Sequence, residues 1–149
     1  MSNAVALVSW SDEFGLGMPE IDEQHRVLIE LINQVWRAVV KRADRTEALP
    51  ILEELEKYTI THFMAEEVFM REIAYPQFAE HKIEHDNFVN RVAEEKAKIV
   101  AGQGVELDMV HFLKDWLINH ILVSDKAYAE QHRRQSSGFL GRFFRRLLS

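Results

Sequence analysis

One stretch in the middle of the chain contains two pairs of polar side chains that few folds can accommodate together. His62 and Glu66 are four residues apart, and so are His81 and His85. On an α-helix this spacing places two side chains on one face, one turn apart. Pro76, between the pairs, favours a turn because it lacks a backbone donor and restricts the residue before it. The pattern predicts a helical hairpin with two facing half-sites for metal.

Apolar residues recur at intervals of three and four in four segments of the chain, which is the stripe that a helix turns toward the core of a bundle. Residues 1–18 lack this period and are predicted to form an extended arm. Pro50 is compatible with the second helix only within its first turn. We expect helices that begin at Pro19, near Thr46, after Pro76 and with Asp108 as a cap, the first ending near Lys41 and the third near Val100.

Every predicted helix places at least one histidine in its apolar stripe. His25 lies in the first helix and His62 in the second, His81 and His85 lie in the third, and His120 lies in the fourth. Short connections make consecutive helices antiparallel, and bundles of this kind build metal sites from facing helices. The sequence therefore predicts an all-α, up-down-up-down four-helix bundle with histidines in its core.

A lone histidine on an apolar face is more often a hydrogen-bonded core residue than a ligand. Five in register are a different case, because burying several imidazoles and carboxylates is costly unless they are paired or bind a metal ion. The candidate ligands are these five histidines together with Glu66 and, less obviously, Asp125.

Asp125 follows His120 by five residues, which rotates it by about 140° on an ideal helix. The two side chains converge only if the helix ends there or is widened, as in a π-helical turn. Periodicity alone does not favour Asp125 over Asp115 or Glu130.

The chain contains no cysteine, which excludes thiolate zinc sites, iron–sulfur clusters and a thiol nucleophile. Any metal must bind nitrogen and oxygen. Five neutral imidazoles and two carboxylates suit two cations, and iron or manganese fits this donor set, although the order of affinities alone leaves zinc and copper open. No histidine follows a glutamate by three residues, as it does in the carboxylate-rich di-iron bundles.

Charge bears on partners and location. The net charge is −6, and the chain after residue 132 contains five arginines and no acid, so the remainder is strongly acidic. An acidic body repels nucleic acid. No apolar run approaches the length of a spanning helix and no leader pattern is present, so a cytoplasmic location is expected.

The motifs together resemble one known family. They are IDEQH ending in His25, HFMAEE with His62 and Glu66, HKIEH with His81 and His85, and HILVSD with His120 and Asp125, and they resemble the hemerythrin pattern, in particular that of the single-domain bacteriohemerythrins. The likeness covers about residues 8–131 and fills all seven ligand positions. It implies a non-haem di-iron centre with an oxo or hydroxo bridge, and reversible binding of O2 instead of catalysis.

The resemblance also implies a role for each residue. One iron would bind His81, His85 and His120, the other His25 and His62, and Glu66 and Asp125 would bridge both. The second iron then has one ligand fewer, and O2 would bind at that position. The family's O2 pocket falls here on Phe63, Trp116, Leu117 and Ile121, near Leu28 and Ile29. Ordinary core packing accounts equally well for each of these residues, and the two roles are compatible.

Three polar residues lie outside this set. His111 and His132 match no ligand position and are expected at the surface. Glu67 follows a candidate ligand, and the sequence leaves open whether it contacts a ligand from behind or faces solvent.

Residues 138–149 place apolar side chains on one helical face and arginines toward the other. Such a short amphipathic tail can rest on an anionic membrane surface or dock on a protein partner, and a frayed extension is the alternative.

We divide the chain into a bundle, residues 1–132, and a basic amphipathic C-terminal extension, residues 133–149. Three functions follow: O2 storage, delivery or sensing; a di-iron oxidase or peroxidase; and a module that responds to O2 or iron through the tail.

Overall fold

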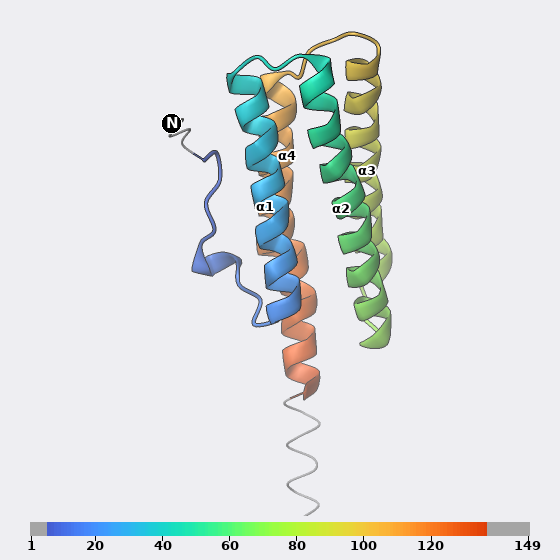
Figure 1. Ribbon diagram of the computed structural model, residues 1–149. Coiled ribbons are helices and arrows are strands. Elements are labelled where there is room, and N and C mark those ends of the chain that lie inside the picture. The colour runs from blue at the N-terminus through green and yellow to red at the C-terminus, as the bar shows by residue number, and fades with distance from the viewer. Residues whose placement is uncertain (1–5, 137–149) are drawn as a thin grey trace, which may run out of the picture.

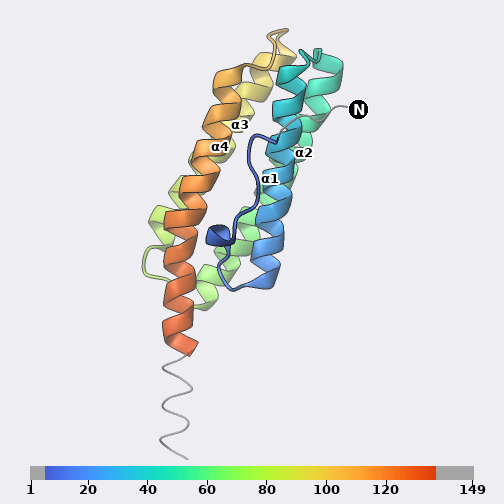
Figure 2. The same cartoon turned by 90° about the vertical axis from the view of Figure 1, so that its left-hand side faces the viewer.

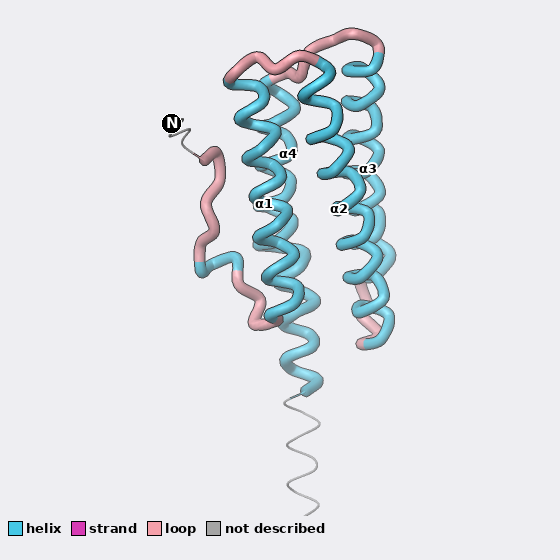
Figure 3. The backbone as a smooth tube through the Cα atoms, viewed as in Figure 1, coloured by secondary structure: helices cyan, strands magenta, loops and turns pink. Residues whose placement is uncertain are grey.

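Four antiparallel helices make up most of residues 6–136, the part of the chain that the computed structural model describes (Figure 1). They are α1 (Pro19–Val40), α2 (Arg45–Glu72), α3 (Phe78–Val100) and α4 (Leu107–Asn119). A π-helical turn, η2 (His120–Asp125), continues α4, and helix resumes from there to residue 136. Only helix and loop occur in this described part (Figure 3). The predicted all-α, up-down-up-down bundle is confirmed.

The most extensive contacts between helices involve α1 and α2. α1 packs against α2 and α4, and α2 packs against α3. The view from the side shows the N-terminal segment lying along the bundle, with the short 3-10 helix η1 (Asp12–Phe14) near its middle (Figure 2). The connections between helices lie at the two ends of the bundle, so each helix contributes one full-length stripe to the core.

The arm before α1 is held by a buried amide. The side chain of Asn33 accepts a hydrogen bond from the backbone N–H of Val8 at 3.0 Å and donates one to its carbonyl at 2.8 Å. Phe14 and Leu16 of the arm are buried against the helices. The arm predicted for residues 1–18 is therefore confirmed for residues 6–18, and its apolar side chains are buried in the core.

The apolar core forms two clusters with a polar layer between them. The larger cluster contains Leu28, Phe63 and Ile121, and the smaller one contains Met70 and Tyr128. Histidines and carboxylates occupy the positions between these clusters in each helix, so the bundle encloses them on both sides.

Two helix starts differ from the sequence-based expectation. Asp44 caps α2 by accepting a hydrogen bond from the N–H of Glu47, so the helix begins at Arg45 and Pro50 lies in the second turn, not the first. One backbone hydrogen bond is lost there, which a long packed helix tolerates. In α4 the cap position is Glu106, and Asp108 lies inside the first turn, where its charge favours the positive end of the helix dipole.

Among the described residues, none of the helices combines the length and the apolar character needed to cross a membrane. The predicted amphipathic tail, residues 138–149, lies outside the described residues. The predicted division of the chain at residue 132 stays a prediction.

Candidate metal centre

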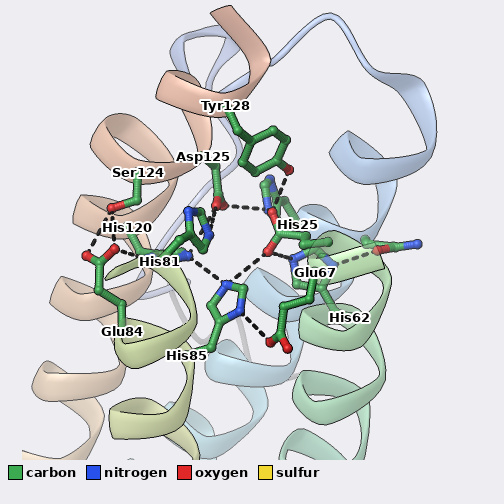
Figure 4. Close-up of polar contacts among 12 residues, drawn as sticks. His25, His62, Glu67, His81, Glu84, His85, His120, Ser124, Asp125 and Tyr128 are labelled. Atoms are coloured by element: carbon green, nitrogen blue, oxygen red, sulfur yellow. Dashed lines mark hydrogen bonds and ion pairs between the residues drawn. The ribbon is translucent and has the colours of Figure 1, made fainter. Parts of the chain in front are cut away.

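The fold brings all seven candidate ligands into one buried cluster, and none of them is more than 3% exposed. α1 contributes one histidine, α2 a histidine and a glutamate, α3 two histidines, and η2 a histidine and an aspartate. The five histidines and the aspartate are labelled in Figure 4. The residues are His25, His62, Glu66, His81, His85, His120 and Asp125.

Three histidines gather on one side of the cluster around Asp125. Oδ1 of Asp125 lies 3.1 Å from Nε2 of His81 and 3.1 Å from Nε2 of His120. Nε2 of His85 lies 3.1 Å from Nε2 of His120. With Glu66, these residues present five ligand atoms that all lie within 4.8 Å of one another.

Two histidines, His25 and His62, lie on the other side, and the same carboxylates reach them. Oε1 of Glu66 lies 3.1 Å from Nε2 of His62, and Oδ2 of Asp125 lies 3.1 Å from Nε2 of His25. His25, His62 and Glu66 form a second group with converging ligand atoms, so Glu66 is shared by both groups. Each carboxylate therefore contacts histidines of both sides.

The π-helical turn explains how Asp125 reaches the cluster. One extra residue per turn widens the helix between His120 and Asp125 and brings a spacing of five onto one face. The sequence-based expectation that His120 and Asp125 converge only where the helix is widened or ends is confirmed. The structure shows the widened helix.

Most of the unsatisfied polar atoms in the core point into this cluster. Among the described residues, eight buried side-chain nitrogen or oxygen atoms lack a hydrogen-bond partner, and all but one belong to the cluster, the exception being Oγ1 of Thr59. Both oxygens of Asp125 and both ring nitrogens of His25 are among them. Buried polar groups normally find partners, so a convergent set without them fits bound cations.

The electrostatics favour ionised carboxylates. Burial and the charge of Asp125 both raise the pKa of Glu66, but the contacts with His62 and His85 outweigh them and lower it to about 2. Burial lowers the pKa of His120, yet the charge of Asp125 raises it to about 10. The metal-free cluster is thus a network of carboxylates and imidazolium, and a cation that replaces protons would take over this compensation.

A second ring of polar residues holds the cluster from outside. Nδ1 of His62 contacts Oε1 of Gln24 at 2.6 Å, and Nδ1 of His85 contacts Oε2 of Glu67 at 3.0 Å. The hydroxyl of Ser124 donates to Glu84, whose carboxylate lies 3.8 Å from Nδ1 of His120. Glu67 therefore contacts a candidate ligand from behind, which resolves the alternative left open above.

Sequence reasoning missed the roles of Gln24, Glu84 and Tyr128. The hydroxyl of Tyr128 donates to Oε2 of Glu66 at 2.5 Å inside the core. A signal existed for this residue, since it follows Asp125 by three positions and so shares its helical face. Gln24 and Glu84 act on histidines of other helices, and no local spacing marks such contacts.

Two of the four predicted pocket residues stack on histidines of the cluster. Phe63 stacks on His85 with ring centroids 3.8 Å apart and an interplanar angle of 3°, and Trp116 stacks on His120 at 4.4 Å and 14°. Phe63, Leu117 and Ile121 are buried in the larger apolar cluster, and Trp116 packs against it. Their predicted role in binding O2 stays a prediction.

The two remaining histidines lie away from the cluster. His111 is exposed and packs near Trp36, as expected. His132 is half-buried with its edge against the ring of Phe69.

Comparison with known proteins gives one consistent result. The model of the hemerythrin HHE cation-binding domain matches residues 16–131. The chain is 36% identical to a bacteriohemerythrin of Stenotrophomonas maltophilia, over 95% of this chain and 98% of that protein, and 36% identical to one of Methylococcus capsulatus, over 83% and 95%. A crystal structure of wild-type hemerythrin superposes with a TM-score of 0.78 at 35% identity, covering 84% of this chain and 97% of that one. With this match over most of its length, the chain belongs to the hemerythrin family.

Proposed function

We propose that this chain binds O2 reversibly at a non-haem di-iron centre and serves O2 storage, delivery or sensing. The observation that carries the proposal is the convergence of seven buried nitrogen and oxygen donors, most with unpaired atoms, in a core without any thiolate. Its similarity to proteins named bacteriohemerythrin supports the choice of iron and O2.

The arrangement supports an unequal division of ligands. His81, His85 and His120 would hold one iron, and His25 and His62 the other. Glu66 and Asp125 would bridge the two, together with an oxo or hydroxo group, because each carboxylate contacts histidines of both sides. The side with two histidines has one protein ligand fewer, which makes it the side for O2.

When bound, a di-iron centre supplies electrons and an open coordination position for O2. The protein must then keep water and protons from the bound gas. Phe63, Leu117 and Ile121 are at most 3% exposed and belong to the larger apolar cluster, and Phe63 stacks on His85, so this cluster excludes solvent on that side. This apolar wall supports a carrier over a catalyst.

One feature favours the rival function, a di-iron oxidase or peroxidase. A groove of about 480 Å³ between α2 and α3 reaches Glu67 and His85, and it also exposes polar Lys82 and Asp86. A small reductant in this groove would approach His85 from behind. Decay of the oxygenated protein discriminates the two functions: a persistent oxygenated form supports a carrier, and immediate peroxide release supports an oxidase.

The decisive experiment is metal analysis followed by anaerobic reduction and titration with O2. We expect two irons per chain and a visible spectrum that appears with O2 and disappears when O2 is removed. One iron per chain, or zinc alone, would refute the centre as assigned.

Binding of residues 138–149 to an anionic membrane surface is tested separately. Deletion of residues 138–149 should abolish co-sedimentation of the protein with anionic liposomes if the tail binds membranes. Equal recovery of the full-length and shortened chains with vesicles would contradict membrane binding.

A further inference from the structure

The imidazoles on the two sides of the cluster have different partners at their outer nitrogens. The Nε2 atoms face the centre, so the Nδ1 atoms carry the outward protons. Nδ1 of His85 donates to the carboxylate of Glu67 at 3.0 Å. Nδ1 of His62 donates to the amide oxygen of Gln24 at 2.6 Å. Both contacts are within hydrogen-bond distance, and only the first involves a charge.

A second carboxylate stands on the three-histidine side. Oε2 of Glu84 lies 3.8 Å from Nδ1 of His120. This distance exceeds a hydrogen bond, but the hydroxyl of Ser124 donates to the carboxylate of Glu84, whose two oxygens lie 2.8 and 2.9 Å away, and so keeps the charge of Glu84 next to the ring.

Among the described residues, no carboxylate is paired with the outer nitrogen of either histidine on the two-histidine side. Nδ1 of His25 is buried and has no hydrogen-bond partner among the described residues. His62 has the neutral Gln24. In the part of the chain that the structure describes, carboxylates therefore stand behind His85 and His120 and not behind His25 or His62.

A carboxylate behind an imidazole has a known physical effect. It accepts the Nδ1 proton in a charge-assisted hydrogen bond and makes Nε2 a stronger donor. A stronger donor stabilises a cation of higher charge more than one of lower charge. A neutral amide oxygen in the same place has a weaker effect.

We propose that Glu67, reinforced by Glu84, and Gln24 polarise the centre, so that the three-histidine side favours ferric iron and the two-histidine side favours ferrous iron. Glu67, Glu84 and Gln24 are positioning residues that act through His85, His120 and His62. The inference rests on the proposed function and deepens it, because it assigns the more strongly donating imidazoles to the iron that has no open position.

The test is a reciprocal, nearly isosteric exchange in the full chain loaded with two irons. An anaerobic redox titration, followed by visible absorption and by EPR at half oxidation, resolves the two one-electron steps. Glu67→Gln should raise the lower of the two reduction potentials, by about 59 mV for each tenfold change in the equilibrium between the ferric and ferrous forms of that iron. Gln24→Glu should lower the upper potential. The separation between the two potentials should decrease in both variants. In Glu67→Gln it decreases because the lower potential rises, and in Gln24→Glu because the upper potential falls.

Glu54→Gln is the matched control, since it removes an exposed carboxylate from the same helix. Shifts of both steps by equal amounts, or shifts no larger than in this control, would overturn the inference. If Glu67→Gln loses iron, Glu84→Gln is the second variant, because Glu84 is 41% exposed and should raise the same lower potential. An unchanged potential there would also overturn it.

Iron counts separate this inference from the proposed function. If the wild-type chain holds two irons and binds O2 reversibly but the variants show no shift in potential, only the proposed polarisation is contradicted. Wild-type chain without two irons would sink both.

Discussion

Tyr128 and Glu66 form a short hydrogen bond between two fully buried side chains, with 2.5 Å between the phenol oxygen and Oε2. Burial and then the charge of Glu66 raise the pKa of Tyr128 well above its usual range, so the hydroxyl remains the donor. The bond occupies Oε2, while Oε1 faces His62 and His85. Tyr128 thus sets the orientation of the carboxylate that both groups share.

Tyr128→Phe should destabilise the metal-free protein by about 1–3 kcal/mol, because Oε2 of Glu66 would remain buried without its donor. Urea unfolding measures the difference. Tyr58→Phe is the control, since Tyr58 is half-buried and its hydroxyl has no hydrogen bond to any described residue. Equal losses in the two variants would contradict a specific role for Tyr128.

The stability of the metal-free protein should depend on pH on both sides of a maximum. The pKa of His120 is raised from 6.5 to about 10, so its contribution is complete below pH 6.5 and is lost as the pH rises to about 10. The pKa of Glu66 is lowered from 4.5 to about 2, so its contribution is present above pH 4.5 and is lost toward pH 2. Denaturation at a series of pH values should show greatest stability between about 4.5 and 6.5.

Bound iron should prevent the loss of stability above pH 6.5. Metal binding needs imidazoles without the Nε2 proton, so the affinity for iron rises with pH. The loaded protein should therefore keep its melting temperature between pH 6.5 and 9, where the metal-free protein loses stability. Parallel curves for the two forms would argue that iron is not bound at His120.

Asp125→Asn should reduce the iron content below two per chain. The carboxylate contacts His81 and His120 through one oxygen and His25 through the other, and an amide keeps only one of these oxygens as a ligand. Metal analysis after reconstitution measures the loss. Asp115→Asn, an exposed change in α4, should retain both irons.

Phe63→Leu should shorten the lifetime of the oxygenated protein several-fold. The change removes the ring that lies parallel to His85 and opens space for water beside the histidines, while an apolar side chain remains. The first-order decay of the oxygenated spectrum measures it. Phe112→Leu, a half-buried change under Arg91, should leave the decay unaltered.

Two helix ends offer gains in stability that are independent of the centre. Arg42 and Ala74 lie two residues beyond the ends of α1 and α2 with φ of 53° and 51°, whereas Gly102 has the same place after α3 with φ of 101°. A side chain in this left-handed region is strained, so Arg42→Gly and Ala74→Gly should each stabilise the protein by about 0.5–1 kcal/mol. Gly102→Ala should do the reverse, although no atom crowds it. Thermal unfolding tests all three.

Local periodicity was sufficient for the helices and for the residues that face the core. A period of 3.6 places His62 with Glu66 and His81 with His85 whatever the neighbours are, and the structure keeps both pairs on one face. The position of Asp125 could be stated only conditionally, because a π-helical turn has no local sequence signature. Pro50 was misplaced because the Asp44 cap sets the start of α2.

The sequence by itself determined the all-α bundle, the absence of thiolate ligands and the stripe on which each candidate ligand lies, since these depend on residue type and on spacing within one helix. Only the tertiary structure decided which carboxylate or amide stands behind which imidazole. Gln24 reaches His62 from α1, and Glu84 reaches His120 from α3. Such contacts depend on the axial offset and rotation of neighbouring helices, which side-chain packing sets and no spacing within one helix encodes.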